Sequence, residues 1–136
     1  MSQALIDTNV LIDLVFERSE SISRRFSAAT FSGDALFLSA ISLYEFRFGA
    51  ECSRRREFQL TALAGFLSTV AVIDFDSADA ERAALLKGAL TARDAMIGSL
   101  DLLIAAQALE RGLVVVTGNL GEFNRVEGLR CEDWEG

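Results

Sequence analysis

Short apolar runs alternate along this chain with longer segments in which apolar residues recur at helical spacing. The first run, QALI, stops at Asp7-Thr8-Asn9, three residues that suit the start of a helix. Residues 9–17 then place apolar side chains one turn apart, and residues 20–32 repeat the pattern up to the turn signal Gly33-Asp34. A strand followed by two helices is therefore predicted for this part of the chain.

The same alternation continues to the end of the chain. The further predicted elements are a strand at 35–39, helices at about 42–50 and 55–67, a strand at 70–75, a helix at 77–93, a helix at 99–111 ended by Gly112, a strand at 113–117 and a last short strand at 129–132. Strands that are continuous apolar runs and alternate with helices indicate a parallel sheet covered on both faces. We therefore predict one α/β domain over residues 1–136, with a mostly parallel sheet of four to five strands. In such sheets the functional crevice lies at the carboxyl ends of the strands.

Composition narrows the class of protein. Apolar residues make up 51% and charged residues 24% of the chain, as in a soluble globular protein. Charged residues break the apolar runs before they reach the roughly 18 residues of a membrane span. The start, MSQALID, lacks a basic region followed by an apolar stretch, so no signal peptide is predicted and the cytoplasm is the expected location.

The net charge of −7 argues against a nucleic-acid binder that works through bulk charge. A bound divalent cation would change that sum locally. Twelve of the 13 basic residues are arginine, with clusters at Arg24-Arg25 and Arg54-Arg55-Arg56. These clusters are either local phosphate-binding patches or solvated helix faces, and the sequence leaves both interpretations open.

Several common kinds of chemistry are excluded because their residues are missing. The chain has no histidine, and Lys87 is its only lysine. Cys52 and Cys131 show no CxxC spacing, so zinc is not expected; two reduced thiols are predicted, with one disulfide as the alternative. If the protein is an enzyme, carboxylates and a metal ion are therefore the expected means of catalysis.

Four acidic or amide side chains stand where such a site would form. Asp7 and Asn119 come just past predicted strands, and Glu45 and Asp101 lie at the start of predicted helices. Like charges brought together would destabilise the fold without a counter-ion, and Mg²⁺ prefers carboxylate oxygens. Such a site could position a water for attack on a phosphodiester.

Each candidate also has a structural explanation. Asp7 could cap the helix that follows it, and Ser42 with Glu45 matches a capping box. Asp101 lies where a negative side chain suits the helix dipole, and Asn119 is a common turn residue. The conjunction of all four, rather than any one of them, favours a site.

Four blocks, LIDTNVLID, SLYEFRFGA, IGSLDLLIAAQAL and VVVTGNLGEFNRVEGLRCEDW, resemble the PIN domain. Within that family they look like the VapC ribonuclease toxins of bacterial toxin–antitoxin pairs, and the resemblance runs from Leu5 to Trp134. It implies an α/β/α sandwich with a central parallel sheet. It also implies an endoribonuclease that depends on Mg²⁺ or Mn²⁺.

The resemblance also assigns roles to residues. Asp7, Glu45 and Asp101 match the acidic triad that would hold the metal and carry catalysis. Asn119 would reach the metal indirectly or through water, and Glu122 matches a further acid beside the site, although a loop glutamate is often simply solvated. Hydroxyl groups that would orient carboxylates and waters are those of Thr8, Ser42 and Thr117.

The implied partners are an RNA substrate, with a tRNA or rRNA loop as the typical target, a small cognate antitoxin and a second copy of the chain. An antitoxin needs exposed apolar residues, and the candidates for these, which core packing would also explain, are Phe16, Phe26, Phe46, Phe48 and Phe58.

The chain departs from the family pattern in two places. The usual proline before the third acid is absent in RDAMIGSLD, which affects the shape of a loop. The loop TGNLGEF has two glycines where relatives tend to carry polar or basic residues, which could weaken the contact with RNA.

Two other functions are compatible with acids at strand ends. A phosphoacceptor signalling domain would need a lysine after a late strand, but Lys87 falls in the middle of a predicted helix. A non-catalytic PIN-like binding module would bind metal without cleaving RNA, and the intact acidic triad argues against it.

Overall fold

The computed structural model describes residues 2–135 and contains one five-stranded sheet. The strands lie in the order β3-β2-β1-β4-β5, and all four pairings between neighbours are parallel. The prediction of a mostly parallel sheet of four to five strands is confirmed. The strands are β1 (Gln3–Ile6), β2 (Ala35–Ser39), β3 (Ala71–Ile73), β4 (Val114–Val116) and β5 (Cys131–Glu132).

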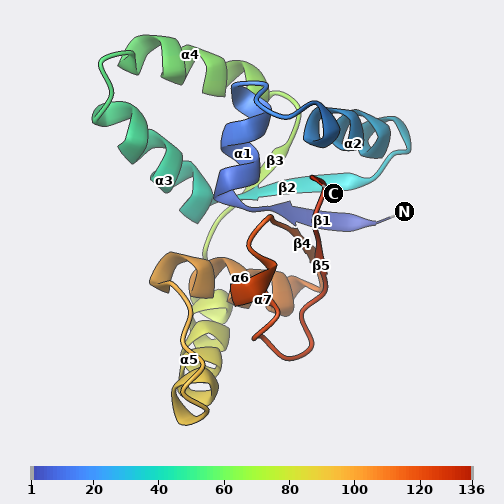
Figure 1. The fold of residues 1–136 in the computed structure, drawn as a ribbon. Coiled ribbons are helices and arrows are strands. Elements are labelled where there is room, and N and C mark those ends of the chain that lie inside the picture. The colour runs from blue at the N-terminus through green and yellow to red at the C-terminus, as the bar shows by residue number, and fades with distance from the viewer. Residues whose placement is uncertain (1, 136) are drawn as a thin grey trace.

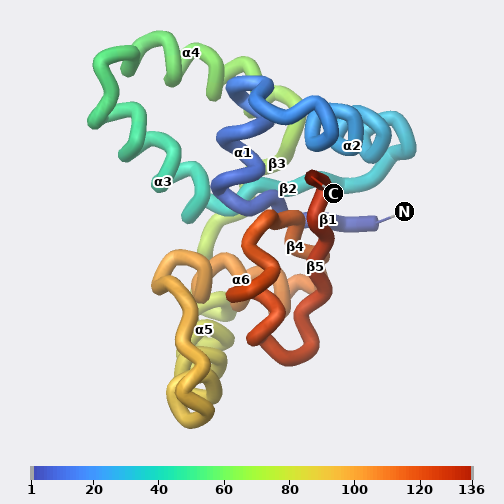
Figure 2. The backbone as a smooth tube through the Cα atoms, in the orientation of Figure 1, coloured from blue at the N-terminus to red at the C-terminus, as the bar shows by residue number. Residues whose placement is uncertain are grey.

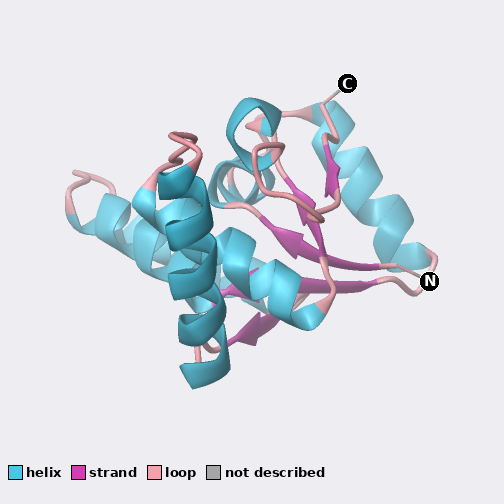
Figure 3. Ribbon diagram, turned by 90° about the horizontal axis from the view of Figure 1, so that it is seen from below, coloured by secondary structure: helices cyan, strands magenta, loops and turns pink. Residues whose placement is uncertain are grey.

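Helices cover both faces of the sheet, as Figure 1 and, from below, Figure 3 show. One layer holds α1 (Thr8–Val15), α2 (Glu20–Phe31), α3 (Ala40–Glu51) and α4 (Arg56–Leu67). The other layer holds α5 (Ser77–Ala92), α6 (Ser99–Arg111) and the short α7 (Leu120–Phe123). The α/β/α sandwich expected from the resemblance is therefore the observed architecture. Within residues 2–135, no helix is both long and apolar enough to cross a membrane.

The alternation of side chains along the central strands explains the two layers. In β1, Ala4 and Ile6 pack into the core beneath α1 to α4, whereas Leu5 packs into the core beneath α5 to α7. In β4, Val116 packs into the core beneath α1 to α4, and Val115 packs into the core beneath α5 to α7. Because successive strand residues point to opposite faces, a continuous apolar run supplies both cores.

The predicted element boundaries agree with the structure to within two residues at each end. One consequence of a small shift is important: α3 begins at Ala40, and Ser39 caps it by accepting a hydrogen bond from the Ile41 N–H at 3.0 Å. The capping box predicted as an alternative for Ser42 and Glu45 is therefore wrong. The four-residue helix α7 was not predicted, because a helix this short has no apolar periodicity to reveal it.

The C-terminal segment returns across the sheet towards α2, as the tube in Figure 2 shows. Trp134 is buried in the same core as Ile22 of α2, and the Ser21 hydroxyl donates to the Trp134 carbonyl at 2.7 Å. Arg25 lies over the Trp134 ring, 5.9 Å from its centroid. Half of the Arg24-Arg25 cluster therefore packs against the protein's own C-terminal segment.

The other predicted features of the surface have local explanations. Arg24 pairs with Glu20 one turn earlier in α2, and Arg56 pairs with Glu51 and Glu57. These contacts favour solvated helix faces for much of the two arginine clusters. Cys52 and Cys131 are both free thiols, as predicted.

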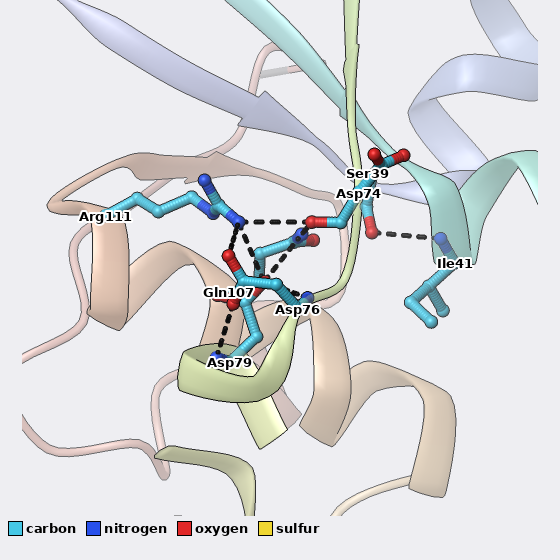
Figure 4. A network of polar contacts seen from close by, with 7 residues as sticks. All are labelled: Ser39, Ile41, Asp74, Asp76, Asp79, Gln107 and Arg111. Atoms are coloured by element: carbon cyan, nitrogen blue, oxygen red, sulfur yellow. Dashed lines mark hydrogen bonds and ion pairs between the residues drawn. The ribbon is translucent and has the colours of Figure 1, made fainter. Parts of the chain in front are cut away.

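A buried polar network fixes α5 to α6 and to the end of β3 (Figure 4). The Asp79 side chain is fully buried, and Arg111 donates to its Oδ2 at 2.8 Å. Asp79 and Asp76 form a capping box at the start of α5, with bonds of 2.9 and 3.0 Å. Gln107 donates to the Asp74 carbonyl at 2.9 Å. One acidic residue thus joins two helices of the same layer.

Candidate active site

The site begins where the central strands β1 and β4 end side by side. The Asp7 N–H donates to the Val116 carbonyl at 3.0 Å, which brings the residue after β1 next to the residue after β4. The Asp7 side chain is buried, and it caps α1 by accepting from the Thr8 N–H at 2.6 Å. Its other oxygen, Oδ2, accepts a hydrogen bond from the Thr117 hydroxyl at 2.7 Å. Asp7 is therefore both a helix cap and a rigidly held carboxylate.

Thr8 connects this carboxylate to helix α3. Its hydroxyl donates to Oε1 of Glu45 at 2.6 Å and lies 2.9 Å from the fully buried hydroxyl of Ser42. In Figure 1, α1 and α3 both begin near the carboxyl end of β1. The Thr8 hydroxyl thus connects the carboxylate of Glu45 with the hydroxyl of Ser42. The role of these hydroxyl groups around a metal stays a prediction.

A second group of contacts surrounds Glu122 in α7. The carboxylate of Glu122 accepts hydrogen bonds from the Asn119 side-chain amide and, at 3.1 Å, from the Gly98 N–H. Glu122 also lies close enough to Asp101, in the first turn of α6, for each carboxyl group to shift the pKa of the other. Asn119 therefore holds a neighbouring acid, a more specific role than the predicted indirect contact with metal.

Thr117 joins the two groups, because its Oγ1 donates to Asp7 and accepts from the Asn119 N–H at 2.9 Å. One hydrogen-bonded network therefore contains seven of the eight residues proposed from the sequence, which are Asp7, Thr8, Ser42, Glu45, Thr117, Asn119 and Glu122. The eighth, Asp101, interacts electrostatically with Asp7, Glu45 and Glu122 of this network.

The electrostatics show how strongly the acids interact. Burial raises the pKa of Asp101 to about 7, and the negative charges of Asp7, Glu122 and Glu45 contribute to this shift. Burial also raises the pKa of Asp7, against the hydrogen bonds from Thr117 and Thr8. The hydrogen bonds from Asn119, Gly98 and Asp101 lower the pKa of Glu122. The neighbouring carboxyl groups of Asp101 and Glu122 thus have pKa values shifted in opposite directions.

The donor set suits a hard divalent cation, because every side chain that interacts with Asp101 here offers carboxylate oxygen. Within residues 2–135, however, no three His, Cys, Asp or Glu side chains converge closely enough to hold an ion as they lie. The contacts give the reason: Asp101 turns to Glu122, and Glu45 turns to Thr8. A cation bound among these carboxylates would relieve the repulsion that contributes to the raised pKa of Asp101.

Sequence reasoning missed two groups that shape this site. The Gly98 N–H has no side-chain signal, and a Cβ added at Gly98 would lie 3.4 Å from Oδ2 of Asp101. Arg125, whose charge lowers the pKa of Glu122, follows the short helix α7 that the sequence did not predict. The spacing of Glu122 and Arg125, three residues apart, is the one signal that could have paired them.

The sequence model of the PIN domain matches residues 4–129. The chain belongs to the PIN domain family. Among curated proteins, this PIN domain is similar to the tRNA(fMet)-specific endonuclease VapC of Salmonella typhimurium, at 37% identity, with 98% of this chain and 99% of that protein covered. The protein of the same name from Shigella flexneri is 35% identical over the same shares of the two chains.

A solved structure shows the same likeness in three dimensions. The PIN domain superimposes on a chain of DNA-bound VapBC from Salmonella typhimurium with a TM-score of 0.90 and 37% identity, covering 98% of this chain and 99% of that one. These relatives place the protein among the VapC members of the family.

Thr117→Val is expected to reduce any metal-dependent activity of this PIN domain by about 10- to 100-fold, because it removes the donor that orients Asp7. Valine is close to threonine in shape, so the loss would come from the hydroxyl. Comparison of cleavage rates and melting temperatures of the two proteins measures this effect. Unchanged rates in the folded variant would show that Asp7 needs no orienting donor.

Proposed function

We propose that this protein is a Mg²⁺- or Mn²⁺-dependent endoribonuclease and the toxin of a toxin–antitoxin pair. The observation that carries the proposal is the gathering of Asp7, Glu45, Asp101 and Glu122 at the carboxyl edge of the sheet, where burial and their mutual repulsion raise the pKa of Asp101 to about 7. The names of the curated relatives, which are ribonucleases and tRNA endonucleases, support the choice of RNA as substrate.

Asp7, Glu45 and Asp101 would hold the metal, with Glu122 beside it. A bound divalent ion supplies a nucleophile from water at neutral pH and stabilises charge on the phosphate. Other side chains hold these carboxylates in place. Thr117 and Thr8 fix the carboxylate of Asp7, and Thr8 also fixes that of Glu45. Asn119 and the Gly98 N–H hold the carboxylate of Glu122 beside these ligands.

An antitoxin partner is supported by the solved relatives, which are toxin–antitoxin complexes. Of the five candidate phenylalanines, Phe48 and Phe58 are exposed by 62% and 54% and remain available to a partner. Phe46 is buried in the core, and Phe16 and Phe26 pack partly against it. For these three residues, core packing was the correct interpretation. Association of two copies of the chain stays a prediction.

Purified protein is expected to cleave a mixed tRNA and mRNA pool when Mg²⁺ or Mn²⁺ is added and to stop when EDTA removes the metal. The reason is that a metal held by these acids would stabilise the negative charge that builds up on the phosphate during cleavage. Mapped cut sites would identify the substrate. Cleavage that persists at full rate in EDTA would contradict the proposal.

The main alternative is a PIN-like module that binds metal without cleaving RNA. It predicts that Mn²⁺ binds to the folded, partner-free protein while no RNA in the pool is cut. The phosphoacceptor alternative lacks its lysine, because Lys87 lies in the middle of α5.

A further inference from the structure

The turn between α5 and α6, residues 93–98, decides where the acidic side chains of α6 and α7 meet. It leads directly into α6, whose third residue is Asp101, and its last residue donates its N–H to Glu122. The turn contains no proline, so no covalent ring fixes its φ angles in this chain. Its shape must come from hydrogen bonds and packing.

Backbone contacts hold the first half of the turn. The N–H groups of Asp94 and Ala95 donate to the carbonyls of Thr91 and Leu90 at 3.1 and 2.9 Å, which ends α5. Asp94 takes a left-handed conformation, with φ of 52°, which aspartate tolerates better than most residues. This half therefore belongs to the end of α5.

Two arginine side chains, one from the turn and one from the segment after α7, hold the second half of the turn. Arg125 donates from Nη1 to the Met96 carbonyl at 2.7 Å, and the Arg93 guanidinium donates to the carbonyl of Arg125. The turn and the segment after α7 are thus joined by two hydrogen bonds, one donated by an arginine of each segment. Ile97 lies between these contacts and is buried in the core beneath α6.

The segment that carries Arg125 is itself firmly anchored. Phe123 and Val126 are buried in the same core as Ile97, and the Arg125 N–H donates to the Glu122 carbonyl at 2.9 Å. Glu122 and Arg125 therefore belong to one short rigid unit. This unit makes two hydrogen bonds to the turn: Glu122 accepts from the Gly98 N–H, and Arg125 donates to the Met96 carbonyl.

We infer that Arg125, together with Arg93, is a positioning residue for the acidic site. It holds the turn against α7 so that Gly98 reaches Glu122 and α6 presents Asp101 beside it. The inference rests on the proposed function for its effect on cleavage. Arg125 directs a guanidinium N–H at the Met96 carbonyl, and this contact within the protein is the one that carries the inference.

Arg125→Met is expected to lower kcat for RNA cleavage by about tenfold or more, because small misplacements of reacting groups are costly, while KM changes little. Arg125→Lys keeps a donor and a charge and should recover part of the rate. Arg93→Met should reduce kcat in the same direction. Arg130→Met is the matched control, because Arg130 also donates to a backbone carbonyl, that of Gly112, but at the opposite end of α6. It should leave kcat unchanged.

A second readout separates this inference from the proposed function. Amide hydrogen exchange at Gly98, followed by NMR, is expected to become about tenfold faster in Arg125→Met and to stay unchanged in Arg130→Met. If the wild-type protein cleaves no RNA, the proposed function fails, and the exchange at Gly98 still decides whether Arg125 positions the turn.

Two results would overturn the inference. A lower melting temperature with unchanged kcat and unchanged exchange at Gly98 would make Arg125 a purely structural residue. A raised KM with unchanged kcat and exchange would make it a contact for RNA instead.

Discussion

Asp101→Asn is expected to lower metal-dependent RNA cleavage by about 1,000-fold or more while the protein stays folded. Asparagine keeps the size of the side chain and removes the negative charge that would bind the metal. It also removes the carboxyl group that interacts electrostatically with Glu122. The measurement is the initial rate of cleavage at saturating Mg²⁺, with Asp34→Asn as a control at the amino-terminal end of the sheet, before β2.

The same variant should show how much the ionised carboxylate of Asp101 destabilises the folded, metal-free protein. The pKa of Asp101 is about 7 in the folded protein and 3.8 ordinarily, so ionisation favours the unfolded chain. Stability that is present below pH 4 is thus lost as the pH rises through 7. In EDTA at pH 8, Asp101→Asn should melt about 3 °C above the wild type, after allowance for solvent screening, and at pH 4 the two should agree.

Full cleavage activity in Asp101→Asn would refute the proposed mechanism. Equal melting temperatures at pH 8 would show instead that the carboxylates do not repel one another in the metal-free protein. Added Mg²⁺ should stabilise the wild type more than the variant, because an ion that binds only the folded state adds to its stability.

Arg111→Met is expected to reduce the free energy of unfolding by about 3 kcal/mol, the second large effect. Arg111 donates to the fully buried carboxylate of Asp79, whose Oδ1 has no hydrogen-bond partner in the described protein. The contact with Asp79 also raises the pKa of Arg111, so the arginine stays charged. Removal of the Arg111 guanidinium leaves the buried negative charge of Asp79 without a cationic partner between α5 and α6.

Urea unfolding measures this loss, and a second variant tests its cause. Asp79→Asn in the Arg111→Met background should recover part of the stability, because it removes the stranded charge. Arg82→Met is the control: Arg82 joins the same two helices through Glu110, 3.2 Å away, but that pair is exposed and should cost less than about 1 kcal/mol. Equal losses for Arg82→Met and Arg111→Met would show that burial of Asp79 is unimportant.

Much of the fold and of the site could be predicted from the sequence, because both follow from local patterns. The apolar runs ended where the polar residues began, so Asp7 and Thr117 were correctly placed at the ends of strands. Parallel pairing of β1 with β4 then brings them together without further information. The resemblance to a family supplied the remaining acids.

The contacts between segments could not be predicted, because they depend on tertiary packing. Ser42 and Glu45 matched a capping box, yet α3 begins two residues earlier and both side chains turn to Thr8 on another helix. The hydrogen bond from Gly98 to Glu122 spans 24 residues and involves a backbone donor, which leaves no trace in the sequence.

The hydrogen bond between Thr117 and Asp7 joins residues 110 positions apart. On the ribosome, Asp7 is made 110 residues before Thr117, so its carboxylate lacks this donor until the segment that pairs with β1 as β4 has also been made. If the protein is the nuclease proposed here, a growing chain without Thr117 does not yet hold Asp7 in its catalytic position. Such a chain is harmless to the RNA that surrounds it until β4 has emerged and paired with β1.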